Sequence, residues 1–107
     1  MTTLGQALDE LVATVESRAS ADPSTSYTAK LIASGPARCA KKLGEEAVET
    51  ALAAVSDTST LAEESADLLY HLIVTLKACN VPPSAIADAL ARRRAQSGLE
   101  EKAGRGS

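Results

Sequence analysis

The chain has 107 residues, a formal net charge of −3 and 45% hydrophobic residues. This length indicates one domain or one subunit of a small oligomer, and the weak net acidity argues against nucleic acid or a membrane surface as a partner. The only aromatic residues are two tyrosines, so each helix buries little area. A homodimer or larger homo-oligomer is therefore expected to complete the core.

The chain start and its cysteines indicate a soluble cytoplasmic protein. The first ten residues, MTTLGQALDE, carry acids and no basic residue, unlike a signal peptide. The apolar run LLYHLIVTL is too short to cross a bilayer. Cys39 and Cys79 lack CxxC spacing and are expected to be reduced and buried.

The apolar pattern predicts helices joined by short polar connections. Residues 3–18 place leucine and valine at helical spacing and predict an amphipathic helix. Residues 20–26 read SADPSTS, which is a turn-rich linker. A short helix follows, with Ser26 as its N-cap and Gly35 as the residue that ends it.

Two longer helices are predicted in the middle of the chain. Pro36 fits the first turn of a third helix, which continues to about Val55. Thr58, Ser59 or Thr60 is expected to cap a fourth helix. That helix runs to about residue 79 and ends at the proline-containing stretch NVPPS.

A fifth helix is predicted over residues 84–96. No segment shows the period-2 alternation of a strand, so the predicted fold class is all-α. We expect an antiparallel helical bundle of about four to five helices, completed by oligomerisation. Residues 1–97 form one domain in this interpretation, and residues 98–107 form a polar C-terminal tail that is partly mobile.

Acidic residues lie beside apolar ones on the third predicted helix. Glu46 and Glu49 share a face with Lys42, because residues three or four apart lie on one side of a helix. The adjoining stripe is apolar and is expected to be buried; it comprises Leu43, Ala47, Ala51 and Val55. Glu46 and Glu49 are therefore expected at the margin of the buried face.

Glu64, Asp67 and His71 form one stripe of the fourth predicted helix, whose other residues are largely apolar. Helices joined by a short loop tend to pack antiparallel, which brings Glu64 and Asp67 opposite Glu46 and Glu49. Converging carboxylates repel one another unless a cation lies between them, and Mg²⁺ prefers oxygen ligands. The spacing therefore predicts a divalent cation site between the two helices.

Two other interpretations of the acids are open at this point. Glu46 and Glu49 are also explained as solvated surface acids, because charge runs on exposed faces are common. The cations that would offset them are Arg38, Lys41 and Lys42. A carboxylate-bridged di-iron site would need Glu-x-x-His pairs, and the single histidine stands at a different spacing.

Four motifs in order resemble the phosphoribosyl-ATP pyrophosphohydrolase family of histidine biosynthesis. They are SYTAKL at 26–31, KKLGEEAVE at 41–49, EESADLLYHL at 63–72 and SGLEEKAGR at 97–105. The resemblance spans residues 4–105 and is to the stand-alone form of the enzyme. The EExxE…ExxD pattern of the wider all-α NTP pyrophosphatases falls on Glu45, Glu46, Glu49, Glu64 and Asp67.

The resemblance implies Mg²⁺-dependent hydrolysis of phosphoribosyl-ATP to phosphoribosyl-AMP and pyrophosphate, the second step of the pathway. The metal ligands that it implies are Glu46, Glu49, Glu64 and Asp67. We expect Glu45 or Glu49 to act as general base and Lys42 to meet the phosphates. The residues expected to bind substrate are Tyr27, Thr28, Lys30, Lys41 and Arg105.

Two alternative functions are compatible with the residues. A housekeeping pyrophosphatase acting on dUTP, dCTP or aberrant nucleoside triphosphates would have the same fold and acids. A non-catalytic helical oligomerisation module would need neither the acids nor Mg²⁺. The tail motif and SYTAKL favour the histidine-pathway enzyme.

Overall fold

A computed structural model of the chain describes residues 1–96, and within them it contains helices and no strand. The elements are α1 (Leu4–Arg18), α2 (Tyr27–Ala33), α3 (Pro36–Ser56), the 3₁₀ turn η1 (Thr58–Thr60), α4 (Leu61–Ala78) and α5 (Ser84–Arg94). The predicted all-α class is confirmed. Across residues 1–96, no helix combines the length and apolarity that a membrane crossing needs. The predicted tail, 98–107, lies outside the described residues.

The starts of α1 and α2 follow from capping by side chains. The Thr3 hydroxyl accepts a hydrogen bond from the Gln6 N–H at 3.1 Å, and the Gln6 side chain accepts one from the Thr3 N–H at 2.9 Å. This reciprocal pair is a capping box. The predicted cap of α2 is confirmed, because the Ser26 hydroxyl accepts from the Ala29 N–H at 3.2 Å.

Gly35 forms the corner between α2 and α3. Its φ is 95°, in the left-handed region that residues with a side chain disfavour. It follows Ser34, the C-cap of α2, and precedes Pro36, the first residue of α3. One residue therefore ends one helix and starts the next, as the sequence predicted for the end of α2.

The start of α4 differs from the prediction. Thr60 occupies the N-cap position, but its side chain makes no cap hydrogen bond and instead donates to the Asp57 carbonyl at 3.1 Å. The Asp57 carboxylate accepts from the Ser59 N–H at 3.1 Å and from its hydroxyl at 2.6 Å. Asp57 thus organises this stretch into a 3₁₀ turn, in which the Ser59 and Thr60 hydroxyls are both bonded to Asp57 instead of capping α4.

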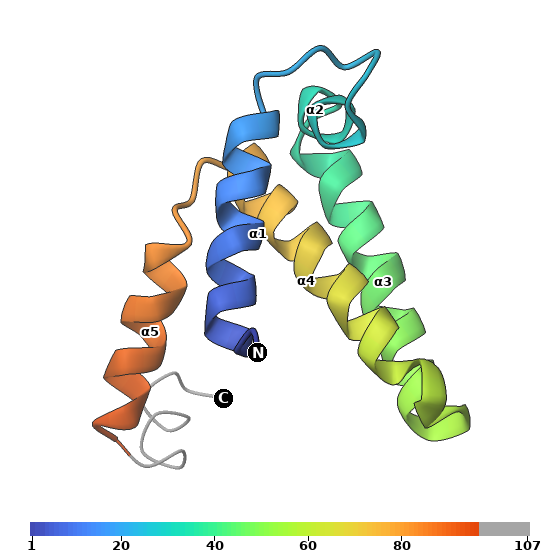
Figure 1. Cartoon of the computed structure of the whole chain (residues 1–107), viewed down its shortest axis with the longest axis vertical. Coiled ribbons are helices and arrows are strands. Elements are labelled where there is room, and N and C mark those ends of the chain that lie inside the picture. Colours follow the sequence, from blue (N-terminus) through green and yellow to red (C-terminus); the bar gives the residue numbers. More distant parts are fainter. Residues whose placement is uncertain (97–107) are drawn as a thin grey trace.

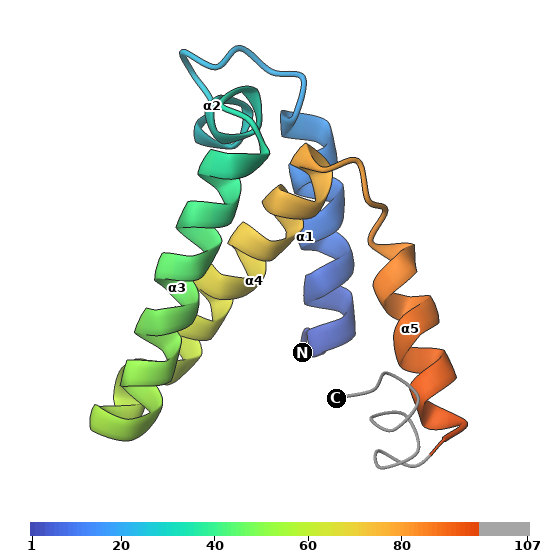
Figure 2. The same ribbon diagram turned by 180° about the vertical axis from the view of Figure 1, so that it is seen from behind.

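The core surrounds α4, on which α1, α2 and α3 all pack (Figures 1 and 2). Its buried members are Val15, Leu31, Cys39, Ile73 and Val74. The Cys39 thiol donates to the Leu31 carbonyl at 3.2 Å, which joins α3 to α2. Cys79 is exposed, contrary to the prediction, because it lies just beyond the last residue of α4.

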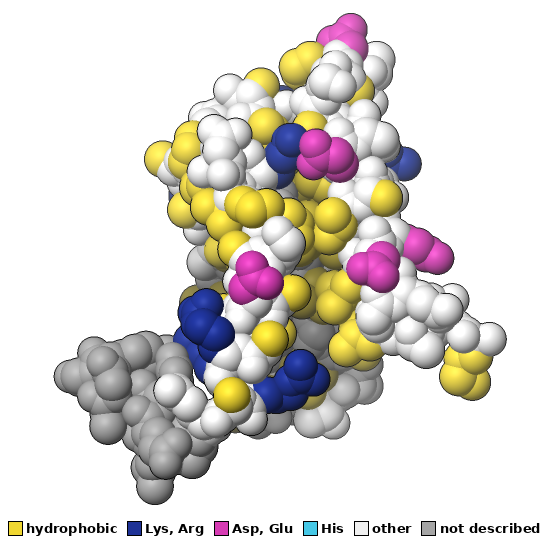
Figure 3. Space-filling view, turned by 90° about the vertical axis from the view of Figure 1, so that its left-hand side faces the viewer, with side chains coloured by type: hydrophobic (Ala, Val, Ile, Leu, Met, Phe, Trp, Pro, Cys, Tyr) yellow, Lys and Arg dark blue, Asp and Glu magenta, His cyan; other side chains and the backbone are white. Residues whose placement is uncertain are grey.

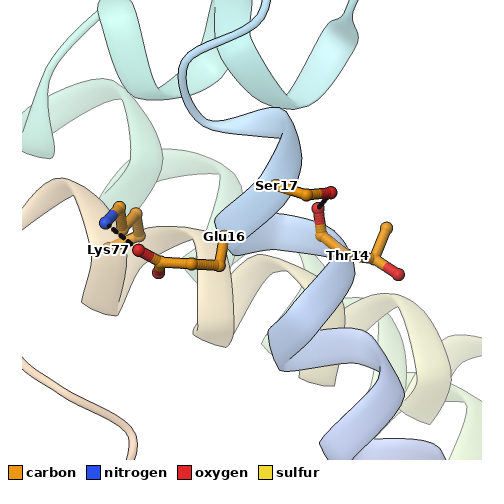
Figure 4. A network of polar contacts seen from close by, with 4 residues as sticks. All are labelled: Thr14, Glu16, Ser17 and Lys77. Carbon is orange, nitrogen blue, oxygen red and sulfur yellow. Dashed lines mark hydrogen bonds and ion pairs between the residues drawn. The ribbon is translucent and has the colours of Figure 1, made fainter.

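An ion pair joins α1 to the C-terminal part of α4. Lys77 Nζ lies 2.7 Å from Glu16 Oε1 (Figure 4). Beside it within α1, the Ser17 hydroxyl donates to the Thr14 carbonyl at 3.0 Å. Exposed ion pairs stabilise a fold only weakly, so the buried apolar residues between these helices hold them together.

The face of α3 that packs against α4 is not the predicted apolar stripe. The buried or half-buried residues of α3 are Cys39, Lys42, Leu43, Glu46, Thr50 and Ala53. Of the predicted stripe, Leu43 alone is among them. Ala47, Ala51 and Val55 are exposed. The physical reason is that Ala53 is small and the Thr50 hydroxyl donates across to α4, so this side allows close approach.

Apolar surface stays exposed on several helices. A stripe on α3 comprises Val48, Leu52 and Val55, with Val55 84% exposed. The helix α5 makes few contacts with the rest of the described chain, and its ribbon stands apart from the other helices (Figures 1 and 2). Figure 3 shows hydrophobic side chains gathered on the face that α1 and α5 present.

Candidate active site

Three carboxylates from α3 and α4 come together on the central hairpin. Glu46, Glu64 and Asp67 each offer an oxygen, and these oxygens lie within 4.8 Å of one another. Thr50 fixes the helices at this level, because its hydroxyl donates to the carbonyl oxygens of Glu46 at 2.8 Å and Glu64 at 3.1 Å. The predicted proximity of the acids on the two helices is thus found, and their role as ligands stays a prediction.

Two oxygens of this acid cluster lack partners. Glu46 Oε2 and Glu64 Oε2 are buried, and neither has a hydrogen-bond partner among the described residues. A buried carboxylate oxygen without a partner is unfavourable. A hard divalent cation would satisfy both, because such ions take carboxylate oxygens as ligands. The donor set therefore fits Mg²⁺.

The environment raises the pKa of two of these carboxyls. Loss of hydration is the main cause for both Glu46 and Glu64, followed by the negative charge of Glu49. The charge of Asp67 adds to both shifts. Glu49 is exposed, and it stands three residues after Glu46 on the same side of α3.

Two further predicted catalytic residues lie on α3 near the cluster: Lys42 stands one turn before Glu46, and Glu45 directly precedes Glu46. Lys42 Nζ is 3.6 Å from Glu45 Oε2. Glu45 is exposed and Lys42 is half-buried. Lys42 therefore brings an ammonium group to the side of α3 that carries Glu46, four residues further on.

His71 lies one turn after Asp67 on α4 and is buried. Its ring is buried against Tyr70, with centroids 5.1 Å apart and an interplanar angle of 81°. Burial lowers the pKa of His71, the charges of Asp67 and Glu45 oppose that shift, and the charge of Lys42 adds to it. The lowered pKa favours the neutral form of the imidazole ring. The charged residues that influence this pKa come from both α3 and α4.

The predicted substrate-binding residues are divided between several places. Tyr27 and Lys30 line a cavity of about 420 Å³ together with Lys42. Thr28 is only 4% exposed, and its hydroxyl lies 2.6 Å from that of Tyr70, so it already has a partner. Lys41 is exposed on α3. Arg105 lies outside the described residues.

Two features of the site were not predicted from the sequence. Arg38 and Ser34 also line the 420 Å³ cavity, whereas the sequence suggested Arg38 only as a counter-charge. Its spacing of four residues from Lys42 was the available signal. The Thr50 bridge had no signal, because a threonine within a helix does not reveal which neighbour it faces.

The fold and the acid cluster together define an all-α protein whose central antiparallel hairpin presents converging carboxylates. Residues 8–94 match the phosphoribosyl-ATP pyrophosphohydrolase family. The match covers most of the chain, and the chain belongs to this family.

Proteins called phosphoribosyl-ATP pyrophosphatase are similar to this chain over nearly its whole length. One from Methylobacterium radiotolerans is 59% identical over 99 residues, which are 92% of each chain. One from Caulobacter sp. is 55% identical over 108 residues and spans all of both chains. One from Rhizobium meliloti is 54% identical over 99 residues, again 92% of each chain.

Proposed function

We propose that this protein hydrolyses phosphoribosyl-ATP to phosphoribosyl-AMP and pyrophosphate with Mg²⁺, as the second step of histidine biosynthesis. Membership of the family supports the activity. The single observation that supports the proposed chemistry is that carboxylate oxygens of Glu46, Glu64 and Asp67 lie within 4.8 Å of one another. Such an arrangement suits a polyphosphate substrate, which arrives with its own negative charge and needs a cation between itself and the acids.

Glu46, Glu64 and Asp67 would hold Mg²⁺, with Glu49 as a fourth carboxylate at the edge. Their fit rests on the two buried oxygens that have no partner among residues 1–96. When bound, Mg²⁺ supplies charge neutralisation for the triphosphate and polarises a phosphoryl oxygen.

The remaining steps are assigned to the chain's own side chains. Glu49 is exposed, and its negative charge helps to raise the pKa of Glu46 and Glu64, which supports it as the residue that takes a proton from the attacking water. Glu45 is the weaker candidate, because it is paired with Lys42. In the reaction, water adds to phosphorus, the bond between the α and β phosphates breaks, and pyrophosphate leaves.

The cations and hydroxyls near the site would bind substrate. Lys42 is half-buried beside the acids and would contact the phosphates as a point charge. The other residues proposed to contact substrate are Tyr27, Thr28, Lys30, Lys41 and Arg105.

A homodimer or larger homo-oligomer is part of the proposal. The α3 stripe of Val48, Leu52 and Val55 is exposed in a single chain, and α5 makes few contacts with the remaining described helices. A second copy would cover both, since contiguous exposed apolar surface marks interaction sites.

The deciding experiment measures pyrophosphate release from phosphoribosyl-ATP beside dUTP and dCTP, with Mg²⁺ and with EDTA. Turnover of phosphoribosyl-ATP that EDTA abolishes is the expected result. Preference for dUTP or dCTP would identify a housekeeping nucleotide pyrophosphatase instead. No release from any of them, combined with an unchanged melting temperature on adding Mg²⁺, would indicate a helical module without catalysis.

A further inference from the structure

A second chemical environment lies next to the acid cluster. The cavity of about 420 Å³ is lined by Tyr27, Lys30, Leu31, Ser34, Arg38 and Lys42. Three of these side chains are cationic and none is acidic. Ligand pockets have volumes of roughly 300–1,000 Å³, so the cavity is large enough for part of a small molecule. We call it the cationic cavity.

The charges of the cationic cavity are largely unneutralised. Lys42 contacts Glu45 at 3.6 Å. Within residues 1–96, Lys30 and Arg38 form no ion pair with any carboxylate. The cavity also lies at the start of α3, since Ser34 and Arg38 flank its first residue, Pro36. The positive end of a helix dipole favours anions there. An anion is therefore the ligand that this cavity would take.

The cationic cavity and the acid cluster follow one another along α3. Arg38, Lys42 and Glu46 stand four residues apart in succession, so they share one side of the helix. At 1.5 Å per residue, Arg38 and Glu46 are about 12 Å apart along the helix axis. This separation is comparable with the length of a nucleoside, so the two sites can hold opposite ends of one nucleotide.

The proposed substrate has such a form. Phosphoribosyl-ATP carries a triphosphate at one end and, on its second ribose, a phosphomonoester at the other. An ordinary nucleoside triphosphate lacks that second phosphate. An acid cluster that holds a cation suits the triphosphate, whereas bare lysine and arginine side chains suit a phosphate that has no metal.

We propose that the cationic cavity binds the phosphomonoester of the phosphoribosyl arm, and that Lys30 and Arg38 thereby select phosphoribosyl-ATP over simple nucleoside triphosphates. The identity of the arm rests on the proposed function. The cavity's preference for a phosphomonoester rests only on its charges and shape. Tyr27, which is 56% exposed at its wall, offers an aromatic face to the sugar or base between the two phosphates.

The binding experiment uses ribose 5-phosphate as the probe, with ribose as the uncharged control. Chemical shifts of the full-length ¹⁵N-labelled protein are followed during titration without Mg²⁺, for wild type, Lys30→Gln and Arg38→Gln. We expect ribose 5-phosphate to shift the amides of α2 and the first turns of α3, and each variant to weaken binding about tenfold. Lys77→Gln removes the same charge far from the cavity and should bind as wild type does.

The kinetic experiment separates specificity from catalysis. For Arg38→Gln, kcat/KM for phosphoribosyl-ATP should fall about tenfold through KM. Any slow release of pyrophosphate from ATP should keep the wild-type rate. The side chains of Lys30 and Arg38 are both exposed, so their replacement should not disturb the fold. A circular dichroism melt checks that Lys30→Gln and Arg38→Gln are folded.

The outcomes distinguish the two proposals. Equal binding of ribose 5-phosphate by wild type and both variants, or equal binding of ribose, overturns the cationic cavity as a phosphate site. An equal loss of rate on phosphoribosyl-ATP and ATP overturns its role in selectivity. Failure of wild type to hydrolyse phosphoribosyl-ATP overturns the proposed function, while variant-sensitive binding of ribose 5-phosphate would still support the phosphate site.

Discussion

The Thr50 hydroxyl on α3 lies 3.1 Å from the backbone carbonyl oxygen of Glu64 on α4. It is also 2.8 Å from the carbonyl of Glu46, one turn earlier on its own helix. A single hydroxyl therefore links the backbones that carry two members of the acid cluster. The spacing between those two carboxylates depends on this contact as well as on side-chain packing.

Replacing Thr50 by valine tests the contact. Thr50→Val keeps the shape but removes the donor, and the net loss for one hydrogen bond is about 1 kcal/mol. For a chain of this size, such a loss lowers the melting temperature by about 4–8 °C. Calorimetry measures it, with Thr60→Val as control, because the Thr60 hydroxyl bonds only within its turn. Equal melting temperatures of wild type and Thr50→Val would contradict the bridge.

Mg²⁺ should stabilise the protein through Glu64. A ligand that binds only the folded state at 100 times its Kd adds about 2.7 kcal/mol to the free energy of unfolding. We expect Glu64→Gln to abolish both this gain and the turnover of phosphoribosyl-ATP. Without Mg²⁺, the same variant should melt at a higher temperature than wild type, because one repelling charge has gone.

Glu63→Gln is the matched control for that experiment. Glu63 precedes Glu64 in the first turn of α4 and is exposed, so it carries the same charge outside the acid cluster. It should keep the Mg²⁺-dependent rise in melting temperature. If both variants retained the rise, the cation would bind elsewhere.

The metal-free protein should lose stability as the pH rises through the titration of the acid cluster. The folded state raises the pKa of Glu46 and Glu64 above the usual 4.5. Between pH 4.5 and those raised values, the folded state holds more protons than the unfolded one, so the free energy of unfolding falls with pH. Urea denaturation in EDTA at several pH values measures the trend.

The double variant Glu46→Gln/Glu64→Gln isolates this contribution. His71 acts in the opposite direction, because burial lowers its pKa and stability is lost as the pH falls below 6.5. Both proteins contain His71, so their difference removes its effect. The stability of wild type relative to the double variant should decline with rising pH, and a constant difference would show that the fold does not raise the pKa of these carboxyls.

A charge on the exposed stripe of α3 should break the proposed oligomer. Leu52 is 58% exposed in a single chain, so Leu52→Glu has little effect on an isolated subunit. In an interface it would bury an unpaired charge. Light scattering after size-exclusion chromatography should show a shift from oligomer to monomer. Ala54→Glu, on another face of α3, should leave the mass unchanged.

The helices and the meeting of the acids could be predicted because both depend on local sequence. Capping by Ser26 and the helix end at Gly35 follow from side-chain and backbone chemistry within a few residues. The spacing of Glu64 and Asp67 on one helix, with Glu46 on its neighbour, follows from helical periodicity and a short connection.

The choice of buried face could not be predicted, because α3 has apolar residues on more than one side. Periodicity favoured the side of Ala47, Ala51 and Val55, whereas α4 packs where Thr50 and Ala53 lie. The cationic cavity needed the corner at Gly35, since only that turn brings Lys30 of α2 beside Arg38 of α3. Such pairings depend on tertiary structure, which no single helix encodes.

All three members of the acid cluster come from one helical hairpin, contiguous in the chain from Glu46 to Asp67. Contacts between neighbouring segments form quickly during folding, so these charges approach one another at an early stage, before the distant helices α1 and α5 need to be in place. The hairpin whose helices are joined by the short turn η1 is then also one whose charges oppose its assembly. A Mg²⁺ ion held as proposed would therefore assist the formation of this hairpin as well as the reaction.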